Sequence, residues 1–198
     1  ATDLGAVDDL TQLELQAKLS KLPRATPPHE STRITAFIDV GGSIHWYCVC
    51  SWDDHFGGSV IEYGTFPRQN RTVFVSSDIR PTLQQTFPGV PDEAAIVKGL
   101  ESLVADLTSR RYSLANGANS LPIDRILIDS GYQTELVYQF CRTLGSPVVT
   151  PSKGFAIGPN RAPMSEWTRK PGERHGESWR LAPTGGTRLL VFDPNYWK

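Results

Sequence analysis

The stretch that decides the fold is Ile34-Thr35-Ala36-Phe37-Ile38-Asp39, which Val40-Gly41-Gly42 follows. Its apolar residues are typical of a strand covered on both faces, and the two glycines indicate a turn into the next strand. Asp39 has no packing reason to end this strand, because burying an unpaired charge costs free energy. Two further apolar runs end in the same way, namely Arg125-Ile126-Leu127-Ile128-Asp129 and Arg188-Leu189-Leu190-Val191-Phe192-Asp193. Three strands that each end in aspartate predict a functional site.

The composition is that of a globular protein. The chain has 198 residues, of which 39% are hydrophobic and 21% charged, with a formal net charge of −1. This length suits one domain with an appendage, and the net charge predicts no nucleic-acid partner, so any basic surface must be local. No apolar run approaches the roughly 18 residues of a membrane span, and there is no secretory signal. We therefore expect a cytoplasmic protein, in the host cytoplasm if the protein is viral.

The cysteines and the chain ends add two expectations. Three cysteines form an odd number without framework spacing, which favours free thiols in a reducing compartment. Cys48 and Cys50 with His45 or His55 suggest a metal site, but no second ligand pair follows at zinc spacing, so buried thiols are the favoured interpretation. The chain begins at Ala1 and its only methionine is Met164. We expect it to be part of a longer protein.

The periodicity of the chain predicts one main domain over residues 31–198, after a helix and linker over residues 1–30. A frayed terminus is the alternative for residues 1–30. Three strands over 31–67 precede a helix at 91–111, a strand at 125–129, a helix at 134–144 and a strand at 148–150. A hairpin then pairs 178–182 with 188–192, and Pro194 suits the start of a final helix. This order predicts an α/β protein: a ribonuclease H-like mixed sheet with helices on both faces, plus a hairpin and loop insertion before the last helix.

In a ribonuclease H-like fold the first and fourth strands are neighbours. Asp39 and Asp129 would then meet at one sheet edge, and Asp193 would complete the cluster. Clustered carboxylates repel one another unless cations neutralise them, and hard divalent ions such as Mg²⁺ or Mn²⁺ prefer oxygen ligands. Two such ions about 4 Å apart can support cleavage of a phosphodiester bond. The alternative is that each aspartate only caps a loop or helix.

The segment 151–187 has a different composition from the rest of the chain. It carries six Lys or Arg residues against three Glu residues, a surplus of three positive charges, together with Trp167, Trp179 and many Gly and Pro. Such a composition favours a mobile loop that contacts a phosphate backbone, and a solvated surface loop is the alternative. Lys153, between Ser152 and Gly154, is also predicted to reach a scissile or adjacent phosphate during catalysis. The candidate DNA-binding residues are Lys153, Arg161, Arg169, Lys170, Arg174, His175 and Arg180.

Several short motifs resemble the nuclease domain of phage terminase large subunits, in particular the lambda-type family. They are Leu22-Pro23, Pro27-Pro28, the 34–40 strand, Ile128-Asp129-Ser130-Gly131-Tyr132, Ser152-Lys153-Gly154 and the ending Phe192-Asp193-Pro194-Asn195-Tyr196-Trp197-Lys198. The resemblance implies a domain that follows an ATPase motor and cuts concatemeric double-stranded DNA during genome packaging. It implies Asp39, Asp129 and Asp193 as first, second and third metal ligands, and the portal and small terminase subunit as partners.

The chain also departs from that family's pattern. Gly41-Gly42 replaces the polar residue and charged turn usual after the first strand, and the final helix is cut short, which puts the third ligand in doubt. No Walker-type phosphate loop is present, so this chain alone is not expected to hydrolyse ATP. Two other classes stay open: another ribonuclease H-like nuclease or recombinase, of transposase or resolvase type, and a non-catalytic DNA-binding or assembly module. Metal-dependent nicking of plasmid separates the last class from the nucleases, and a neighbouring ATPase separates terminases from the other enzymes.

Overall fold

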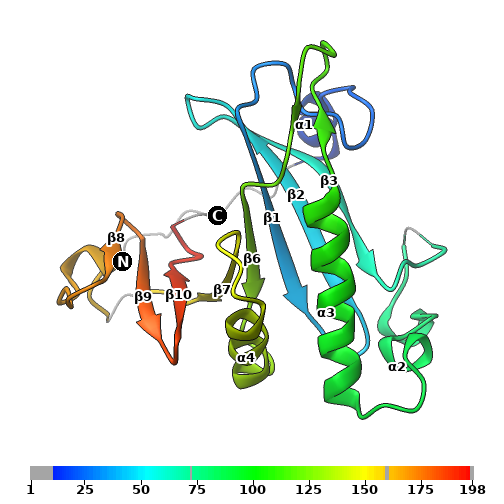
Figure 1. Cartoon of the computed structure of the whole chain (residues 1–198). Helices are drawn as coiled ribbons and strands as arrows, with labels where there is room; N and C mark the ends of the chain where they lie inside the picture. Colours follow the sequence, from blue (N-terminus) through cyan, green and yellow to red (C-terminus); the bar gives the residue numbers. More distant parts are fainter. Residues whose placement is uncertain (1–10, 72, 159–160, 197–198) are drawn as a thin grey trace, which may run out of the picture.

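The structure, a computed structural model, describes residues 11–71, 73–158 and 161–196, and its centre is a large mixed sheet (Figure 1). The sheet has eight strands in the order β3-β2-β1-β6-β7-β10-β9-β8. Its antiparallel half holds β1 (Arg33–Val40), β2 (His45–Trp52) and β3 (Gly58–Phe66). The remaining strands are β6 (Arg125–Asp129), β7 (Val149–Gly154), β8 (Arg174–His175), β9 (Trp179–Thr184) and β10 (Thr187–Phe192). The strands β1, β6, β7 and β10 run parallel to one another, so the mixed α/β sheet predicted from the sequence is confirmed.

The helices and remaining short elements connect these strands. The long helices are α3 (Asp92–Ser109) and α4 (Thr134–Leu144), and the short ones are α1 (Gln12–Ala17) and α2 (Leu83–Thr86). Two 3₁₀ turns, η1 (Ser76–Asp78) and η2 (Met164–Glu166), and a small ladder of β4 (Tyr112–Ser113) with β5 (Ser120–Leu121) complete the described elements. Gly145 ends α4 with a positive φ of 59°, as glycine commonly does after a helix. Among the described residues, no helix is long and apolar enough to cross a membrane.

Both long helices cover the same face of the sheet. Along β1, Ile34, Ile38 and Val40 are buried, whereas Thr35 and Asp39 between them are not. The buried positions join the apolar stripe of α3 and the inner side of α4, and α3 packs against α4 (Figure 1). The expectation of helices on both faces therefore fails for these two helices. The alternation in β1 explains why the helices pack on one face only. Every second side chain of this strand is buried, so one face of the sheet needs a covering layer of helices and the other does not.

The two ends of the domain also differ from the expectation. Residues 1–10 of the expected helix and linker lie outside the described residues, and the first described helix starts after Thr11, whose hydroxyl and Glu14 form a capping box. No residue of α1 is buried. After Asp193, residues 194–196 form a turn rather than the expected start of a helix.

The segment 151–187 is more ordered than a surface loop. The predicted hairpin is confirmed as β9–β10, with Gly185 and Gly186 at its turn in positive φ of 52° and 83°. Phe155 contacts Trp167 edge to face at 5.5 Å, and Met164 is buried. The expectation of a loop outside the sheet is therefore wrong for this segment, because β7, β8 and β9 extend the sheet.

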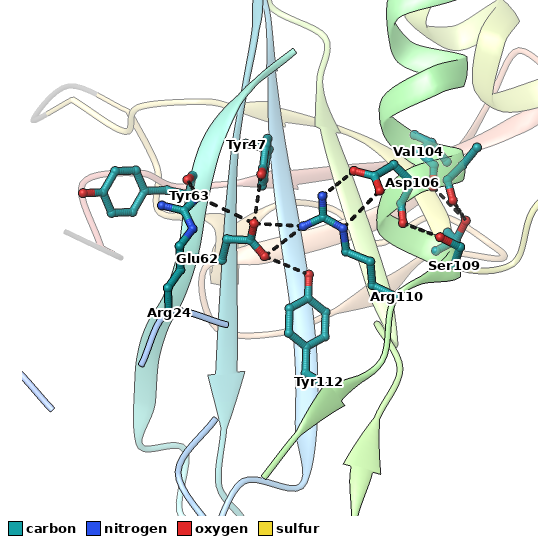
Figure 2. Close-up of polar contacts among 11 residues, drawn as sticks. Arg24, Tyr47, Glu62, Tyr63, Val104, Asp106, Ser109, Arg110 and Tyr112 are labelled. Atoms are coloured by element: carbon teal, nitrogen blue, oxygen red, sulfur yellow. Dashed lines mark hydrogen bonds and ion pairs between the residues drawn. The ribbon is translucent and has the colours of Figure 1, made fainter. Parts of the chain in front are cut away.

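Glu62 on β3 connects the sheet to the end of α3 through a cluster of polar contacts (Figure 2). Its side chain is only 9% exposed, and Arg110 Nη1 donates to both of its carboxylate oxygens at 2.9 Å. The hydroxyls of Tyr47 and Tyr112 donate to the same carboxylate at 3.0 and 3.4 Å. Burial, and then the charge of Glu62, raises the pKa of Tyr112 to about 12, so this hydroxyl stays a donor at neutral pH. Each oxygen of the buried carboxylate therefore has a donor.

This cluster predicts a stability effect. Replacing Glu62 with alanine leaves Arg110 and two tyrosine hydroxyls without their acceptor, so Glu62→Ala should lower the free energy of unfolding by about 3 kcal/mol. Glu101→Ala, on the exposed side of α3, is the control and should change it by about 0.5 kcal/mol or less. Urea denaturation of both variants measures the difference. Equal losses in the two variants would show that the Glu62 cluster contributes nothing.

Candidate metal centre

Asp39 and Asp129 lie at the ends of two neighbouring parallel strands. Ile38 of β1 is in register with Ile128 of β6, so the next residue of each strand is an aspartate at the same level. Ile38 and Ile128 are fully buried under the helices. By strand alternation, both aspartates therefore lie on the opposite face, which α3 and α4 leave uncovered. The strand adjacency predicted from the sequence brings these two residues together.

The charge of Asp129 affects the protonation of Asp39. Asp39 is accessible to solvent, yet partial desolvation, and then the charge of Asp129, raises its pKa above the ordinary value. Asp129 accepts a hydrogen bond from the backbone N–H of Gly131 at 3.2 Å, the local contact expected of an aspartate before Ser-Gly. A divalent cation shared by the pair would remove the repulsion that raises the pKa of Asp39. The chemistry of this pair therefore fits a hard cation.

An aromatic depression adjoins Asp39. Trp46, directly across from Asp39 on β2, stacks on Phe74 with ring centroids 5.2 Å apart. Together with Gly41, Gly42 and residues of the segment 74–79, these two rings border a depression of about 520 Å³ that reaches Asp39. A methyl group at Gly42 would approach the hydroxyl of Tyr132 to 3.2 Å, so the absence of a side chain there admits this tyrosine. These aromatic neighbours were not predicted from the sequence, although the alternation along β2 places Trp46 on a definite face of the sheet.

Asp193 lies apart from the aspartate pair. Asp129 is in register with Ser152 on β7, which is in register with Leu190 on β10. Asp193 follows Leu190 by three residues, which displaces it by about 10 Å along the strand and two strands across the sheet. Its Oδ1 accepts from the backbone N–H groups of Asn195 at 2.9 Å and Ile157 at 3.3 Å. Among the residues that the structure describes, no three His, Cys, Asp or Glu side chains come close enough to hold a metal ion.

The candidate DNA-binding residues divide into those that the fold turns away from the aspartates or bonds to other side chains, and those that are exposed to solvent. Lys153 follows Ser152, the partner of Asp129, so strand alternation places its side chain on the other face of the sheet. His175 and Arg180 both bond to Glu173, whose side chain is only 3% exposed. Because these contacts satisfy Glu173, they favour a structural role for both residues. A hydrogen bond from the Lys170 N–H, followed by the bonds from His175 and Arg180, holds the pKa of Glu173 below its ordinary value.

The other basic candidates are exposed. Arg169, Lys170 and Arg174 have solvent-accessible side chains, and the guanidinium of Arg161 lies 4.7 Å from the centre of the Phe155 ring.

Cys48 and Cys50 are half-buried free thiols with sulfur atoms 3.9 Å apart. A hydrogen bond from Cys50 lowers the pKa of Cys48 to about 7.

The sheet order places the chain among mixed α/β proteins with a ribonuclease H-like fold, and the paired aspartates give it a candidate metal centre. Residues 5–198 match the family described as terminase large subunit gpA, endonuclease domain, and the chain belongs to this family. The suspected family is thereby confirmed. The description of this family gives a nuclease as its class of activity.

Other comparisons add little to this assignment. No curated protein matches the chain. A structure of the PPX-GPPA enzyme of Aquifex aeolicus is similar, with a TM-score of 0.32 and 9% identity over 61% of this chain and 36% of that enzyme. A second structure from the Ppx/GppA family of the same organism has a TM-score of 0.28 and 12% identity over 61% of this chain and 35% of its own. The chain thus spans about a third of the length of these proteins.

The raised pKa of Asp39 predicts a pH-dependent stability effect without metal. A carboxyl group whose folded-state pKa is raised destabilises the folded state as pH rises above its ordinary value of 3.8. Asp39→Asn should therefore be at least as stable as the parent at pH 7 in EDTA, and the difference should vanish below the ordinary pKa.

Thermal denaturation in EDTA over a pH series measures this difference. Asp92→Asn is the matched control, because the exposed Asp92 complements the dipole at the start of α3 and its loss should cost about 0.3–1 kcal/mol. An Asp39→Asn protein that is less stable than the parent at pH 7 would show that Asp39 makes favourable contacts instead of a repulsive one.

Proposed function

We propose that the chain is a Mg²⁺- or Mn²⁺-dependent endonuclease domain that cleaves double-stranded DNA by two-metal phosphodiester hydrolysis. The observation that carries this proposal is the Asp39–Asp129 pair at the ends of adjacent parallel strands. Membership of the terminase gpA endonuclease family supports it, since that family's name gives the class of reaction. In the full-length protein we propose an ATPase motor domain as neighbour, and the portal and small terminase subunit as partners in packaging.

In this proposal Asp39 and Asp129 hold the cations through their oxygen atoms. When bound, the ions supply a nucleophilic water and stabilise the oxygen that leaves phosphorus. The two carboxylates are the permanent charges that fix the cations against the sheet edge, where the buried isoleucines beside them keep both strand ends in place. Asp193 is proposed as a third ligand. To reach the pair, it would have to give up its bonds from Ile157 and Asn195, and the end of β10 would have to move toward β6, because Asp193 lies two strands away.

DNA binding is proposed for the basic residues of the 151–187 segment. Arg161, Arg169, Lys170 and Arg174 support this best, because they are exposed on a segment that extends the sheet. Lys153 is proposed to contact a phosphate from the end of β7, although its side chain lies on the face of the sheet opposite Asp129, so the contact would have to be made around the strand end. His175 and Arg180 would contribute indirectly, by holding Glu173 and hence the strand β8 in place.

The metal centre predicts loss of cleavage when one ligand is removed. Asp39→Asn should lower Mg²⁺- or Mn²⁺-dependent cleavage of plasmid DNA by roughly 10³-fold or more, because the cations contribute several kcal/mol of transition-state stabilisation. Asp92→Asn is the control and should cleave at the parent's rate. A folded Asp39→Asn protein with full activity would refute the assignment. Asp193→Asn with full activity would limit the site to two carboxylates.

The exposed basic residues predict a salt effect. Neutralising Arg169, Lys170 and Arg174 together should weaken binding of duplex DNA and flatten its dependence on salt, because fewer counterions are released. Stability should change little, since the side chains are exposed. Fluorescence anisotropy at several salt concentrations, in EDTA to prevent cleavage, measures both effects. If the triple variant showed the same dependence of DNA affinity on salt concentration as the parent, the DNA would bind elsewhere on the protein.

A further inference from the structure

Four arginines from separate parts of the chain gather around one depression. Arg125 begins β6, Arg142 lies in the last turn of α4, Arg174 begins β8 and Arg188 lies on β10. The depression has a volume of about 560 Å³, and its lining, which lies entirely within the described chain, includes no Asp or Glu. All four arginines are exposed. A net charge of −1 for the whole chain makes such a concentration of positive charge unusual for this protein.

The depression exists because two parallel strands separate. The strands β7 and β10 pair only from Ser152 with Leu190 to Gly154 with Phe192, so their first residues diverge and leave a fork. The end of α4 lies at this fork, and the hairpin β9–β10 lies beside α4 in Figure 1. No local sequence pattern predicts this fork, because it depends on the pairing register of β10.

Backbone carbonyl groups, rather than carboxylates, hold three of these arginines. Arg125 donates to the carbonyl of Pro147, Arg142 donates to that of Gly185 at 2.7 Å, and Arg188 donates to that of Gly172 at 3.4 Å. A carbonyl orients a guanidinium without neutralising its charge, and each guanidinium has five N–H donors. The arginines are thus oriented and still positively charged, which is the arrangement that binds phosphate groups.

The depression adjoins the face of the sheet that carries the aspartate pair through Arg125, whereas Arg142 reaches it from the end of α4, which packs on the other face. Arg125, Leu127 and Asp129 alternate with the buried Ile126 and Ile128 along β6, so all three project away from α3 and α4. Arg125 and Asp129 are four residues apart, roughly 13 Å along the strand. Phosphates in one DNA strand recur about every 3.4 Å along the helix axis, so about four base pairs span this separation.

We propose that this four-arginine depression binds the phosphate backbone of the DNA substrate a few base pairs from the scissile bond. The proposal rests on the nuclease function proposed above and adds a binding site for the same substrate. Arg125, Arg142 and Arg188 lie outside the set that the sequence singled out as DNA contacts. The site fixes the position of the duplex along β6 and carries no sequence information, because phosphate contacts are alike for every base pair.

The test is the affinity of the Arg142→Gln/Arg188→Gln protein for a duplex oligonucleotide, measured by fluorescence anisotropy in EDTA at several salt concentrations. Affinity should fall by about tenfold, and the slope of log affinity against log salt should flatten by about two, near one unit per lost phosphate contact. Arg68→Gln/Arg111→Gln removes the same charge from exposed positions outside the depression and should leave both quantities unchanged. Equal effects in both double variants, or none in either, would overturn the proposal.

Two further measurements separate this proposal from a site for free phosphate and from the proposed metal centre. A site for free phosphate would bind inorganic phosphate while the double variant kept the parent's affinity for DNA, and that result would also overturn it. With Mn²⁺ present, raising the DNA concentration should recover the cleavage rate that Arg142→Gln/Arg188→Gln loses, because the lost contacts act on binding. If Asp39→Asn cleaves normally while the arginine variant still loses affinity, the metal centre is wrong and the backbone site stands. A parent protein that fails to bind duplex DNA at low salt would refute both.

Discussion

The parallel pairing of β1 with β6 is the constraint on which the rest of the structure depends. It sets Ile38 beside Ile128 and thereby places two carboxylates, Asp39 and Asp129, at the same sheet edge. Partial desolvation, and then the charge of Asp129, raises the pKa of Asp39, so its ionised form opposes folding. The pairing persists because the isoleucines of both strands are fully buried beneath α3 and α4, and that apolar burial stabilises the strand contact far more than one exposed repulsion weakens it. The repulsion that remains favours a bound cation.

The position of the helices determines which face is available to a substrate. Both α3 and α4 pack on one side, and the Glu62–Arg110 pair links the end of α3 to β3 on that same side. The other side carries Asp39, Asp129 and Arg125 within one pair of strands. Asp39, Asp129 and Arg125 can therefore contact one duplex, and Arg142 would reach the same duplex from the end of α4. A layer of helices on that side would prevent such contact, so the asymmetry of the fold and the proposed function are related.

Much of this architecture was predictable from local sequence patterns. The apolar runs, the α3 stripe, Gly145 and the Gly185-Gly186 turn each specify an element through nearby residues alone, and these elements were placed correctly. The adjacency of Asp39 and Asp129 followed from element order. The position of Asp193 did not follow, because it depends on the register of β10 against β7 and on local hydrogen bonds to Ile157 and Asn195.

Other features depended on contacts between distant segments and had no local pattern. His175 and Arg180 looked like free basic residues until the fold placed both against Glu173. The stack of Trp46 on Phe74 and the fork that gathers Arg142 and Arg188 join segments that the sequence separates by many residues. Composition alone assigned positive charge to the 151–187 segment, whereas the fold adds charge from β6 and α4. The functional surface is thus a product of tertiary structure more than of any single motif.

The central claim is that Asp39 and Asp129 together hold the catalytic cation, and the most direct measurement is anomalous diffraction from a crystal soaked in Mn²⁺. If both aspartates hold the cation, an anomalous peak should contact carboxylate oxygens of both side chains and should disappear in crystals of the Asp39→Asn protein. A peak bound elsewhere, with none between these two side chains at saturating Mn²⁺, would contradict it.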